Sequence, residues 1–343
     1  MKICNENRLN RREPGAKAFI RRNRSLFSVA LLGLAQVLSG NVLAQSYPVK
    51  AVRLIVPFPP GIYTDTIARL VAQKASEGLS QPVIVENRAG AGGNIGAEFV
   101  SKSPPDGYTL LMGSIAQAVS MSVYDKLAYD LVRDLTAVSM VLSVPNILVA
   151  NPGLPVKTTA ELIALAKAHP GKLTYGSGGN GGAFHLMGEM FKVHSGTNIV
   201  HVPYKGGGPA LVDVVGGQIS IMFITLDSAL PYMNSGKLRA LGVASMKRSP
   251  LAPELPTLAE SVLPGFEIVT WAGILAPSET PRNIVARLNA EIGKALQLAD
   301  VQKRFQALGV EIAPSTPEEF AQFIKAEIAK WTQVVKAAGV KID

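Results

Sequence analysis

Cysteine is almost absent from this chain of 343 residues, which contains only Cys4. That residue lies in a basic N-terminal segment that we expect to be removed. The remaining chain therefore has no disulfide, no thiolate nucleophile and no cysteine-based metal site. Long apolar runs are also lacking after residue 44, so the sequence predicts no membrane span there.

An excess of basic charge is lacking once the N-terminus is set aside. The formal net charge is +9, but the first 44 residues hold eight of the 34 Lys and Arg residues and two of the 25 Asp and Glu residues. The remainder carries 26 basic and 23 acidic residues. This balance does not provide the basic footprint of a nucleic-acid-binding protein, so we expect no nucleic-acid partner.

The N-terminal segment has the three parts of a secretory signal peptide. A basic stretch precedes the short apolar run Ser25–Gly40, and Val42-Leu43-Ala44 supplies a small residue before the expected cleavage. The apolar run is short and interrupted by polar residues, unlike a transmembrane anchor of about 20 residues. We therefore predict a signal peptide over residues 1–44, a mature chain that begins at Gln45, and export to the periplasm.

One local pattern occurs four times: an apolar strand, a tight loop and the start of a helix. In Leu54–Asp65 two prolines and Gly61 end the strand, and Asp65 is predicted to cap the helix that follows. The other three examples are Leu110–Ser114, Leu173–His185 and Val200–Pro209. Such a junction aims free backbone N–H groups and the positive end of a helix dipole at one point. We expect the four loops to face each other across a cleft and to hold a small anion.

The alternation of strands and helices predicts an α/β fold with a parallel sheet, and the length indicates about two domains. We expect the apolar stretch Val138–Ala150 to cross into a second domain and Ile268–Ala276 to return to the first. Capping-box spacing predicts helix starts at Thr158 and Thr316, and Pro281 is expected at the first position of another helix.

Two glycine motifs raise the question of an enzyme. Gly176-x-Gly178-x-x-Gly181 matches the dinucleotide fingerprint, but the ribose-binding region near His201 lacks an acid, and no GxxxxGK[ST] motif occurs. Residues 175–179 resemble a nucleophile elbow around Ser177, but no histidine follows the later acids as an α/β-hydrolase requires. We expect neither a nucleotide cofactor nor a serine hydrolase, although other triad orders exist.

Two further pairs of residues have both a functional and a structural interpretation. His185 and Glu189 lie four residues apart on a predicted helix, but two ligands without a third are more often a solvated or capping pair, so no metal site is predicted. Tyr204 and Lys205 follow a strand and could bind an anion. A lysine that only extends along the surface is an equally good interpretation.

Several long passages closely resemble the tripartite tricarboxylate transporter substrate-binding receptors, the Bug family. In chain order they are YPVKAVRLIVPFPPG, ENRAGAGGNIGAEFV, SPPDGYTLLMGS, HVPYKGGGPALVDVVGGQI, GKLRALGVAS, LPTLAES, PGFE and TPEEFAQFIKAEIAKW. The resemblance covers essentially the whole chain after the signal peptide.

This resemblance implies a two-domain periplasmic-binding-protein fold, of the type II-like Venus-flytrap kind, with a ligand cleft between the domains. The expected domains are 45–145 plus 267–343 and 146–266. The ligand is a small carboxylate: a di- or tricarboxylate, an amino acid or an aromatic acid. The expected ligand-binding residues are Phe58, Pro60, Gly61, Ile62, Tyr63, Thr64, Asp65, Ser114, Ser177, Gly178, Gly179, Asn180, His185, Tyr204, Lys205, Gly206 and Thr225. Among them, the Ser177 hydroxyl is expected to reach a carboxylate.

Two positions depart from the family pattern. The first loop usually reads PPGGxxD, whereas Ile62 here adds a side chain where a ligand would approach the backbone. The late strand often has Asp-Asn after Met-Phe, whereas here Ile224 and Thr225 follow, and Asp227 is displaced. The missing acid weakens recognition of an amino group and favours an apolar or aromatic carboxylate.

The sequence therefore predicts an exported, monomeric receptor, without cofactor or metal, that delivers a carboxylate to membrane permease subunits. The alternative is a periplasmic sensor that docks on a signalling protein. A periplasmic hydrolase that uses Ser177 or His185 is the less favoured possibility.

Overall fold

The computed structural model describes residues 47–61 and 63–340, including the backbone but not the side chain of Tyr63. All the helices and strands described below belong to one compact unit, Lys50–Asp343. The predicted signal peptide and Ile62 lie outside the described residues. Within the described residues, every helix is too short or too polar to cross a bilayer.

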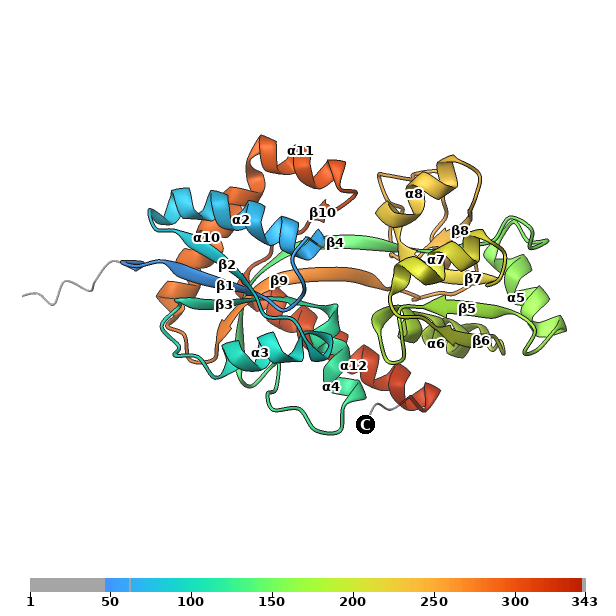
Figure 1. Ribbon diagram of the computed structural model, residues 1–343, viewed down its shortest axis with the longest axis horizontal. Helices are drawn as coiled ribbons and strands as arrows, with labels where there is room; N and C mark the ends of the chain where they lie inside the picture. The colour runs from blue at the N-terminus through green and yellow to red at the C-terminus, as the bar shows by residue number, and fades with distance from the viewer. Residues whose placement is uncertain (1–46, 62, 341–343) are drawn as a thin grey trace, which may run out of the picture. The chain divides into compact units, whose positions relative to one another are not determined.

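The unit Lys50–Asp343 consists of two lobes joined by two long strands, β4 (Leu135–Ala150) and β9 (Val269–Pro277) (Figure 1). The first lobe contains β1 (Val52–Val56), α2 (Tyr63–Leu79), β2 (Val83–Asn87), the 3₁₀ turn η1 (Ala91–Gly93), α3 (Asn94–Ser101), β3 (Thr109–Ser114), α4 (Ile115–Val123), α10 (Arg282–Gln297), α11 (Ala299–Ala307), β10 (Glu311–Ile312) and α12 (Pro317–Ala338). The second lobe contains α5 (Thr159–Ala168), β5 (Thr174–Ser177), α6 (Ala183–Ser195), β6 (Val200–Pro203), α7 (Gly207–Val215), β7 (Ile221–Thr225), α8 (Leu226–Asn234), β8 (Arg239–Val243) and α9 (Leu258–Ser261).

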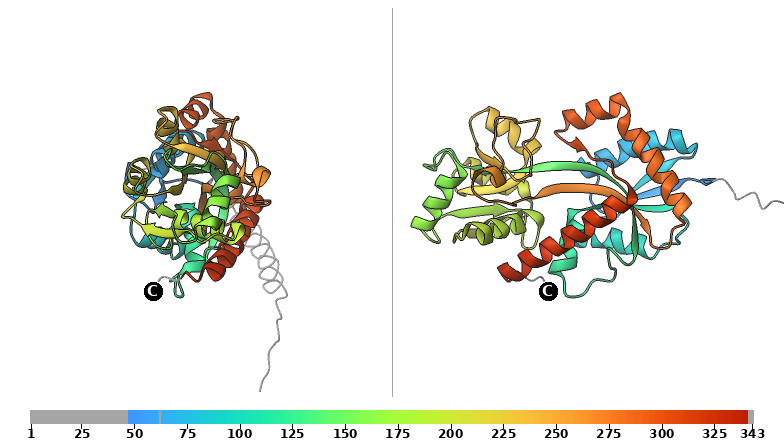
Figure 2. Two further views of the ribbon diagram at one scale, coloured as in Figure 1. Left: turned by 90° about the vertical axis from the view of Figure 1, so that its right-hand side faces the viewer. Right: turned by 180° about the vertical axis from the view of Figure 1, so that it is seen from behind.

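The strands follow the order β2-β1-β3-β9-β4-β7-β5-β6, with β8 and β10 paired to β4. Strands joined by crossover helices are parallel, as in β1 with β2 and β3, and in β5 with β6 and β7. The two linking strands are antiparallel to each other and to their other neighbours. The prediction of a parallel sheet is therefore wrong for the centre of the fold. One linking strand leaves the first lobe and the other returns to it, so they run in opposite directions (Figure 2).

The link between the lobes is polar at the point where β4 changes its neighbour. Strand β4 pairs with β9 as far as Pro145 and with β7 from Asn146 onward. Asn146 is fully buried, and its amide donates to the Ile268 carbonyl and accepts from the Thr270 hydroxyl, both at 3.2 Å. Pro145 has no backbone N–H to donate, so side-chain hydrogen bonds support the crossing at this position. The predicted domain boundary at residues 145 and 146 coincides with this change of partner and stays a prediction.

Helix α12 packs against α4, β4 and α6, and so contacts both lobes. Its Glu327 carboxylate is buried and accepts hydrogen bonds from the indole N–H groups of Trp271 and Trp331, at 3.1 and 3.2 Å. Lys330 forms an ion pair with the same carboxylate. The charge and both indole donors therefore have partners, as a buried ionised group requires.

The predicted helix starts are confirmed at Thr158 and Thr316, whose side chains cap α5 and α12. Pro281 is the N-cap of α10, not its first residue, because its ψ of 136° is extended and the helical conformation begins one residue later. The predicted N-cap at Asp65 is also wrong, because α2 begins two residues earlier. The Asp65 carboxylate instead lies in the first turn and accepts the Gly61 N–H at 3.0 Å.

Candidate functional site

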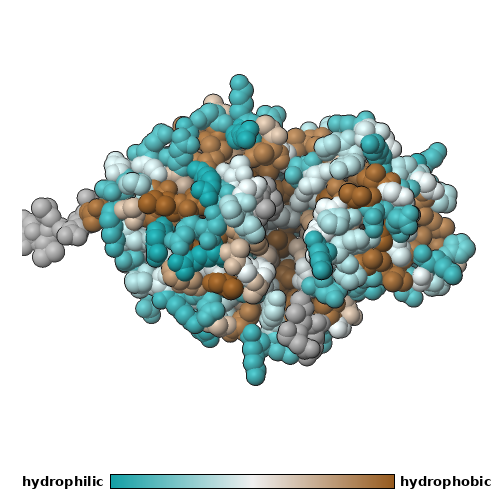
Figure 3. Space-filling model, viewed as in Figure 1, coloured by the Kyte–Doolittle hydropathy of each residue, from teal (hydrophilic) through white to brown (hydrophobic). Residues whose placement is uncertain are grey.

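A cavity of about 380 Å³ lies between the two lobes, where the surface is hollowed in Figure 3. This volume is in the range of small-molecule binding sites. We call it the cleft cavity, and it is lined by Phe58, Thr64, Ser114, Ile115, Ala116, Ala183, Phe184, Gly207, Gly208, Leu211, Ile224, Thr225, Ser228 and Thr270. A smaller cavity of about 130 Å³ shares Ala116 and Ala183 with it and is also lined by Asn180.

Five helices begin at the cleft cavity, and residues of their first turns line it. Helices α2 and α4 come from the first lobe, and α6, α7 and α8 come from the second. The first backbone N–H groups of a helix have no partner within the helix, and its dipole makes this end positive. The structure thus brings together the four predicted strand–loop–helix junctions and adds a fifth. This arrangement favours an anion that is held from both lobes.

The loop before α2 is held by the buried carboxylate of Asp65, which is only 3% exposed. It accepts hydrogen bonds from the Gly61 N–H, the Arg69 guanidinium and the Asn87 amide at 3.0, 3.0 and 2.8 Å. Burial raises the pKa of Asp65, but these three hydrogen bonds outweigh burial and leave the pKa below its usual value. Asn87 also donates to the Phe58 carbonyl at 3.0 Å. Asp65 therefore positions Phe58 and the start of α2, although it does not itself line the cleft cavity.

Ser177 is fully buried and does not line either cavity. Its Oγ lies 2.7 Å from Nε2 of His201, donates to the Gly179 carbonyl and accepts the Gly179 N–H, both at 3.1 Å. The expectation that its hydroxyl reaches a carboxylate is therefore not met, because these internal hydrogen bonds already use the group. A serine beside a histidine can be a nucleophile, but this one has no exposed surface from which to attack a substrate.

Three stacked aromatic rings lie beneath the glycine loop of residues 178–182. The ring centroids of His185 and His201 are 3.9 Å apart, and those of His201 and Tyr175 are 4.8 Å apart. Burial lowers the pKa of His185, and burial together with the neighbouring His185 lowers the pKa of His201 to about 4. Both imidazoles are therefore neutral near pH 7. His185 uses Nδ1 to accept the Gly181 N–H at 2.9 Å, so it shapes the loop instead of presenting a charge to a ligand.

The buried Glu189 has protein partners and is not arranged to bind a metal. It accepts from the Tyr175 hydroxyl at 2.5 Å and from the Lys192 ammonium at 2.8 Å. The His185 Nε2 lies 3.9 Å from its carboxylate. Among the described residues no group of three His, Cys, Asp or Glu side chains could hold a metal ion.

The backbone at Gly178 lies against the start of α7. A Cβ at this position would be 3.1 Å from the Gly207 nitrogen and 3.2 Å from the Gly206 carbonyl carbon. Gly206 also donates its N–H to the Gly178 carbonyl at 3.2 Å. Next to this contact, the Tyr204 hydroxyl donates to Asp213 at 2.6 Å, and Lys205 is exposed. The loop that contains Gly178 and the loop that contains Gly206 therefore hold one another in place.

The structure thus places the sequence-predicted residues in four groups. Phe58, Thr64, Ser114 and Thr225 line the cleft cavity, and Asn180 lines the smaller one. A second group supports the loops without lining either cavity, and its members are Gly61, Asp65, Ser177, Gly178, Gly179, His185, Tyr204 and Gly206. Pro60 and Lys205 are exposed, and the side chains of Ile62 and Tyr63 lie outside the described residues.

Several residues that line the cleft cavity were not expected from the sequence. Most of them follow a selected residue by one to four positions, in the first turns of helices, and are Ile115, Ala116, Ala183, Phe184, Gly207, Gly208 and Ser228. The predicted helix starts could have indicated this group. Thr270 on β9 and Leu211 on α7 carry no local signal, because only the packing of the lobes brings them to the cavity.

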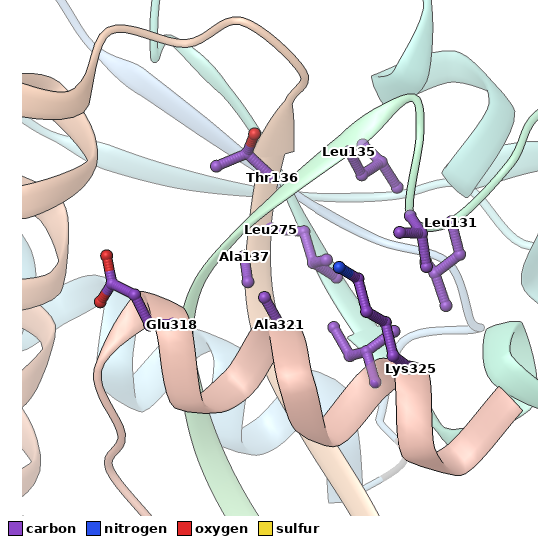
Figure 4. Close-up of a pocket in the computed structure, with 10 residues that line it drawn as sticks. Leu131, Leu135, Thr136, Ala137, Leu275, Glu318, Ala321 and Lys325 are labelled. Atoms are coloured by element: carbon purple, nitrogen blue, oxygen red, sulfur yellow. The ribbon is translucent and has the colours of Figure 1, made fainter. Parts of the chain in front are cut away.

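A separate cavity of about 260 Å³ lies where α12 crosses the start of β4 (Figure 4). Leu131, Leu135 and Leu275 supply apolar lining, and Glu318 and Lys325 supply two exposed charges. It lacks the convergence of helix N-termini seen at the cleft cavity, so we do not place an anion site there.

The chain is similar to a family of receptors and to several of its members. A sequence profile described as "Tripartite tricarboxylate transporter family receptor" matches residues 67–340. Protein BugT of Bordetella pertussis is 40% identical over 316 residues, which cover 92% of this chain and 96% of that protein. A solved structure of R. palustris Rpa4515 with adipate is 37% identical, with a TM-score of 0.74 and coverage of 86% of this chain and 99% of that one. A structure of MatC (Rpa3494) from Rhodopseudomonas palustris with bound malate is 35% identical, with a TM-score of 0.71 and coverage of 84% and 100%.

Proposed function

The chain belongs to the tripartite tricarboxylate transporter receptor family, and we propose that it binds a small carboxylate in the cleft cavity and delivers it to a membrane permease of this type. It has the two-domain α/β fold of periplasmic binding proteins. The family is one of solute-binding receptors and not of enzymes. Two similar proteins have structures with the carboxylates adipate and malate, which supports the proposed ligand class.

The observation that carries this proposal is the convergence of five helix N-termini on one cavity. Two of these helices belong to the first lobe and three to the second, so a carboxylate held by their N–H groups would bridge the lobes. Binding would then favour the conformation in which the lobes are close. A permease that recognises this conformation could distinguish the loaded receptor from the empty one.

The proposal predicts that removal of one backbone donor weakens binding. Ala183 is the first residue of α6, and Gly182 before it has φ −72° and ψ 163°, a conformation that suits the residue before a proline. Proline is well accepted at this helical position, so Ala183→Pro removes one N–H and leaves the helix intact. A hydrogen bond to a charged group contributes about 1.5 kcal/mol, so we expect affinity to fall about tenfold.

This prediction is tested by titration calorimetry after a thermal-shift screen of adipate, malate, citrate and 3-phenylpropionate. Ala183→Gly is the control, because it changes the side chain at the same position but keeps the backbone N–H. Equal affinity in the two variants would show that the Ala183 N–H of α6 does not bind the ligand. If no carboxylate in the screen binds the wild-type protein, the proposed function fails.

We further propose that the chain is exported to the periplasm and that its N-terminal segment is cleaved off after Ala44. Family membership supports this location, because the family is one of periplasmic receptors. The basic and apolar segments of residues 1–44 support the route. The intact mass of protein released from the periplasm should correspond to a chain that begins at Gln45. A full-length chain retained in the membrane fraction would contradict this part of the proposal.

A further inference from the structure

None of the fourteen described residues that line the cleft cavity is charged. Seven of the lining residues are apolar: Phe58, Ile115, Ala116, Ala183, Phe184, Leu211 and Ile224. The polar ones carry only hydroxyl groups: Thr64, Ser114, Thr225, Ser228 and Thr270. Because these described residues include no Lys or Arg, the groups that can attract an anion here are the helix N-termini.

Several of these hydroxyls already have protein partners. Ser114 bonds to the Gln117 side chain at 3.0 Å, the Thr225 and Ser228 hydroxyls are 2.9 Å apart, and Thr270 donates to Asn146. A ligand with many polar groups would have to compete for them, and each buried group left without a partner costs about 1–3 kcal/mol. The lining is therefore better suited to one anionic group than to several.

The two phenylalanines come from opposite lobes. Phe58 follows β1 of the first lobe, and Phe184 lies in the first turn of α6 in the second. Leu211 and Ile224 add aliphatic surface from α7 and β7. Aromatic side chains favour offset or edge contacts with other rings, and aliphatic side chains pack on ring faces. A ligand with a flat apolar body would thus be covered from both lobes.

Among the described residues of the cavity wall, none offers a carboxylate to an ammonium group. Asp65 does not line the cavity, and its oxygens are used by Gly61, Arg69 and Asn87. Asp227 has one buried oxygen without a hydrogen-bond partner among the described residues, but it does not line the cavity either. It packs against Gly309, where an added Cβ would lie 2.6 Å from the Asp227 Cβ. The ends of five helix dipoles would also repel a cation.

We infer that the ligand of the cleft cavity is a monocarboxylate with an aromatic, apolar body and without an ammonium group. This inference rests on the proposed function and narrows its substrate class. It separates this chain from receptors that take amino acids or compounds with several carboxylates.

The test compares ligands that differ in the ammonium group, in the number of carboxylates and in the ring. 3-Phenylpropionate and L-phenylalanine share the ring and the carboxylate, and only the second carries an ammonium group. Citrate and adipate have additional carboxylates and lack the ring. Titration calorimetry of the mature protein should show 3-phenylpropionate binding at least tenfold more tightly than each of the other three.

A variant with an acid on the cavity wall tests the reason for this preference. Ser228 lies in the first turn of α8, where an acidic residue is compatible with the helix dipole, so Ser228→Asp should fold. This variant should bind 3-phenylpropionate more weakly and L-phenylalanine more tightly, and so shift the ratio of the two affinities by about tenfold or more. Ser228→Asn has nearly the same size without the charge and should shift the ratio less. Val212→Asp, on the exposed side of α7, places the same charge outside the cavity and should leave the ratio unchanged.

The outcomes separate this inference from the proposed function. Tighter binding of citrate, adipate or L-phenylalanine would overturn the inference and leave a carboxylate receptor in place. For L-phenylalanine, loss of binding in Asp227→Asn would then identify the ammonium partner. If neither these four ligands nor malate binds, both the inference and the proposed function are overturned. An unchanged ratio in Ser228→Asp would show that the wall charge does not set ligand class, which contradicts the inference.

Discussion

Asp65→Ala is expected to lower the free energy of unfolding by about 3 kcal/mol and to weaken ligand binding. The carboxylate is almost fully buried and receives hydrogen bonds from Gly61, Arg69 and Asn87. Alanine would leave the Gly61 N–H and one Asn87 donor without an acceptor. Because Asn87 also holds the Phe58 carbonyl, the loop at the cleft cavity would lose its support. Denaturant unfolding measures the first effect, and calorimetry with the tightest carboxylate measures the second.

Two further variants separate the role of this carboxylate from a general effect of charge. Asp65→Asn keeps the size and one acceptor oxygen and should cost less than the alanine variant. Glu77→Ala removes an exposed carboxylate from the same helix, where a surface ion pair with Lys74 contributes at most about 1 kcal/mol. If Asp65→Ala is as stable as Glu77→Ala, Asp65 does not organise the loop.

Gly178→Val is expected to reduce affinity about hundredfold. The added side chain would meet the backbone of Gly206 and Gly207, which begins α7 and forms part of the cleft cavity wall. Backbone atoms cannot move aside as the end of a flexible side chain can, so the start of α7 must shift. Overpacking of this kind costs about 1–3 kcal/mol of stability. The displaced N-terminus would also lose hydrogen bonds to a carboxylate, and a loss of about 2.7 kcal/mol corresponds to a hundredfold change in dissociation constant. The valine therefore acts by displacing a helix N-terminus and need not touch the ligand.

The same substitution at Gly293 provides the control. This glycine lies inside α10, and an added Cβ there would meet no atom within 4 Å. Gly293→Val should retain wild-type affinity, and thermal melting of both variants would show whether each is folded. Wild-type affinity in a folded Gly178→Val protein would contradict the role of the contact between the two loops.

The sequence alone identified the parts of the site that depend on neighbouring residues. Apolar runs that end in glycine or proline, followed by helical periodicity, place helix starts near Phe58, Ser114, Ser177 and Gly206, because turns and caps are decided locally. The capping residues Thr158 and Thr316 were predicted for the same reason. The resemblance to a receptor family followed from motifs in these same segments.

Only the tertiary structure decided which of these residues face the cavity. Tyr175 and His201 lie opposite each other in the register of β5 and β6. This register places the His201 ring against Ser177, so the Ser177 hydroxyl forms a hydrogen bond within the lobe. Strand register depends on partners distant in sequence, so no local pattern could show this pairing. Thr270 reaches the cavity for a similar reason, because β9 returns antiparallel to β4 between the lobes. Local sequence determined where helices begin, and long-range packing determined what their first turns enclose.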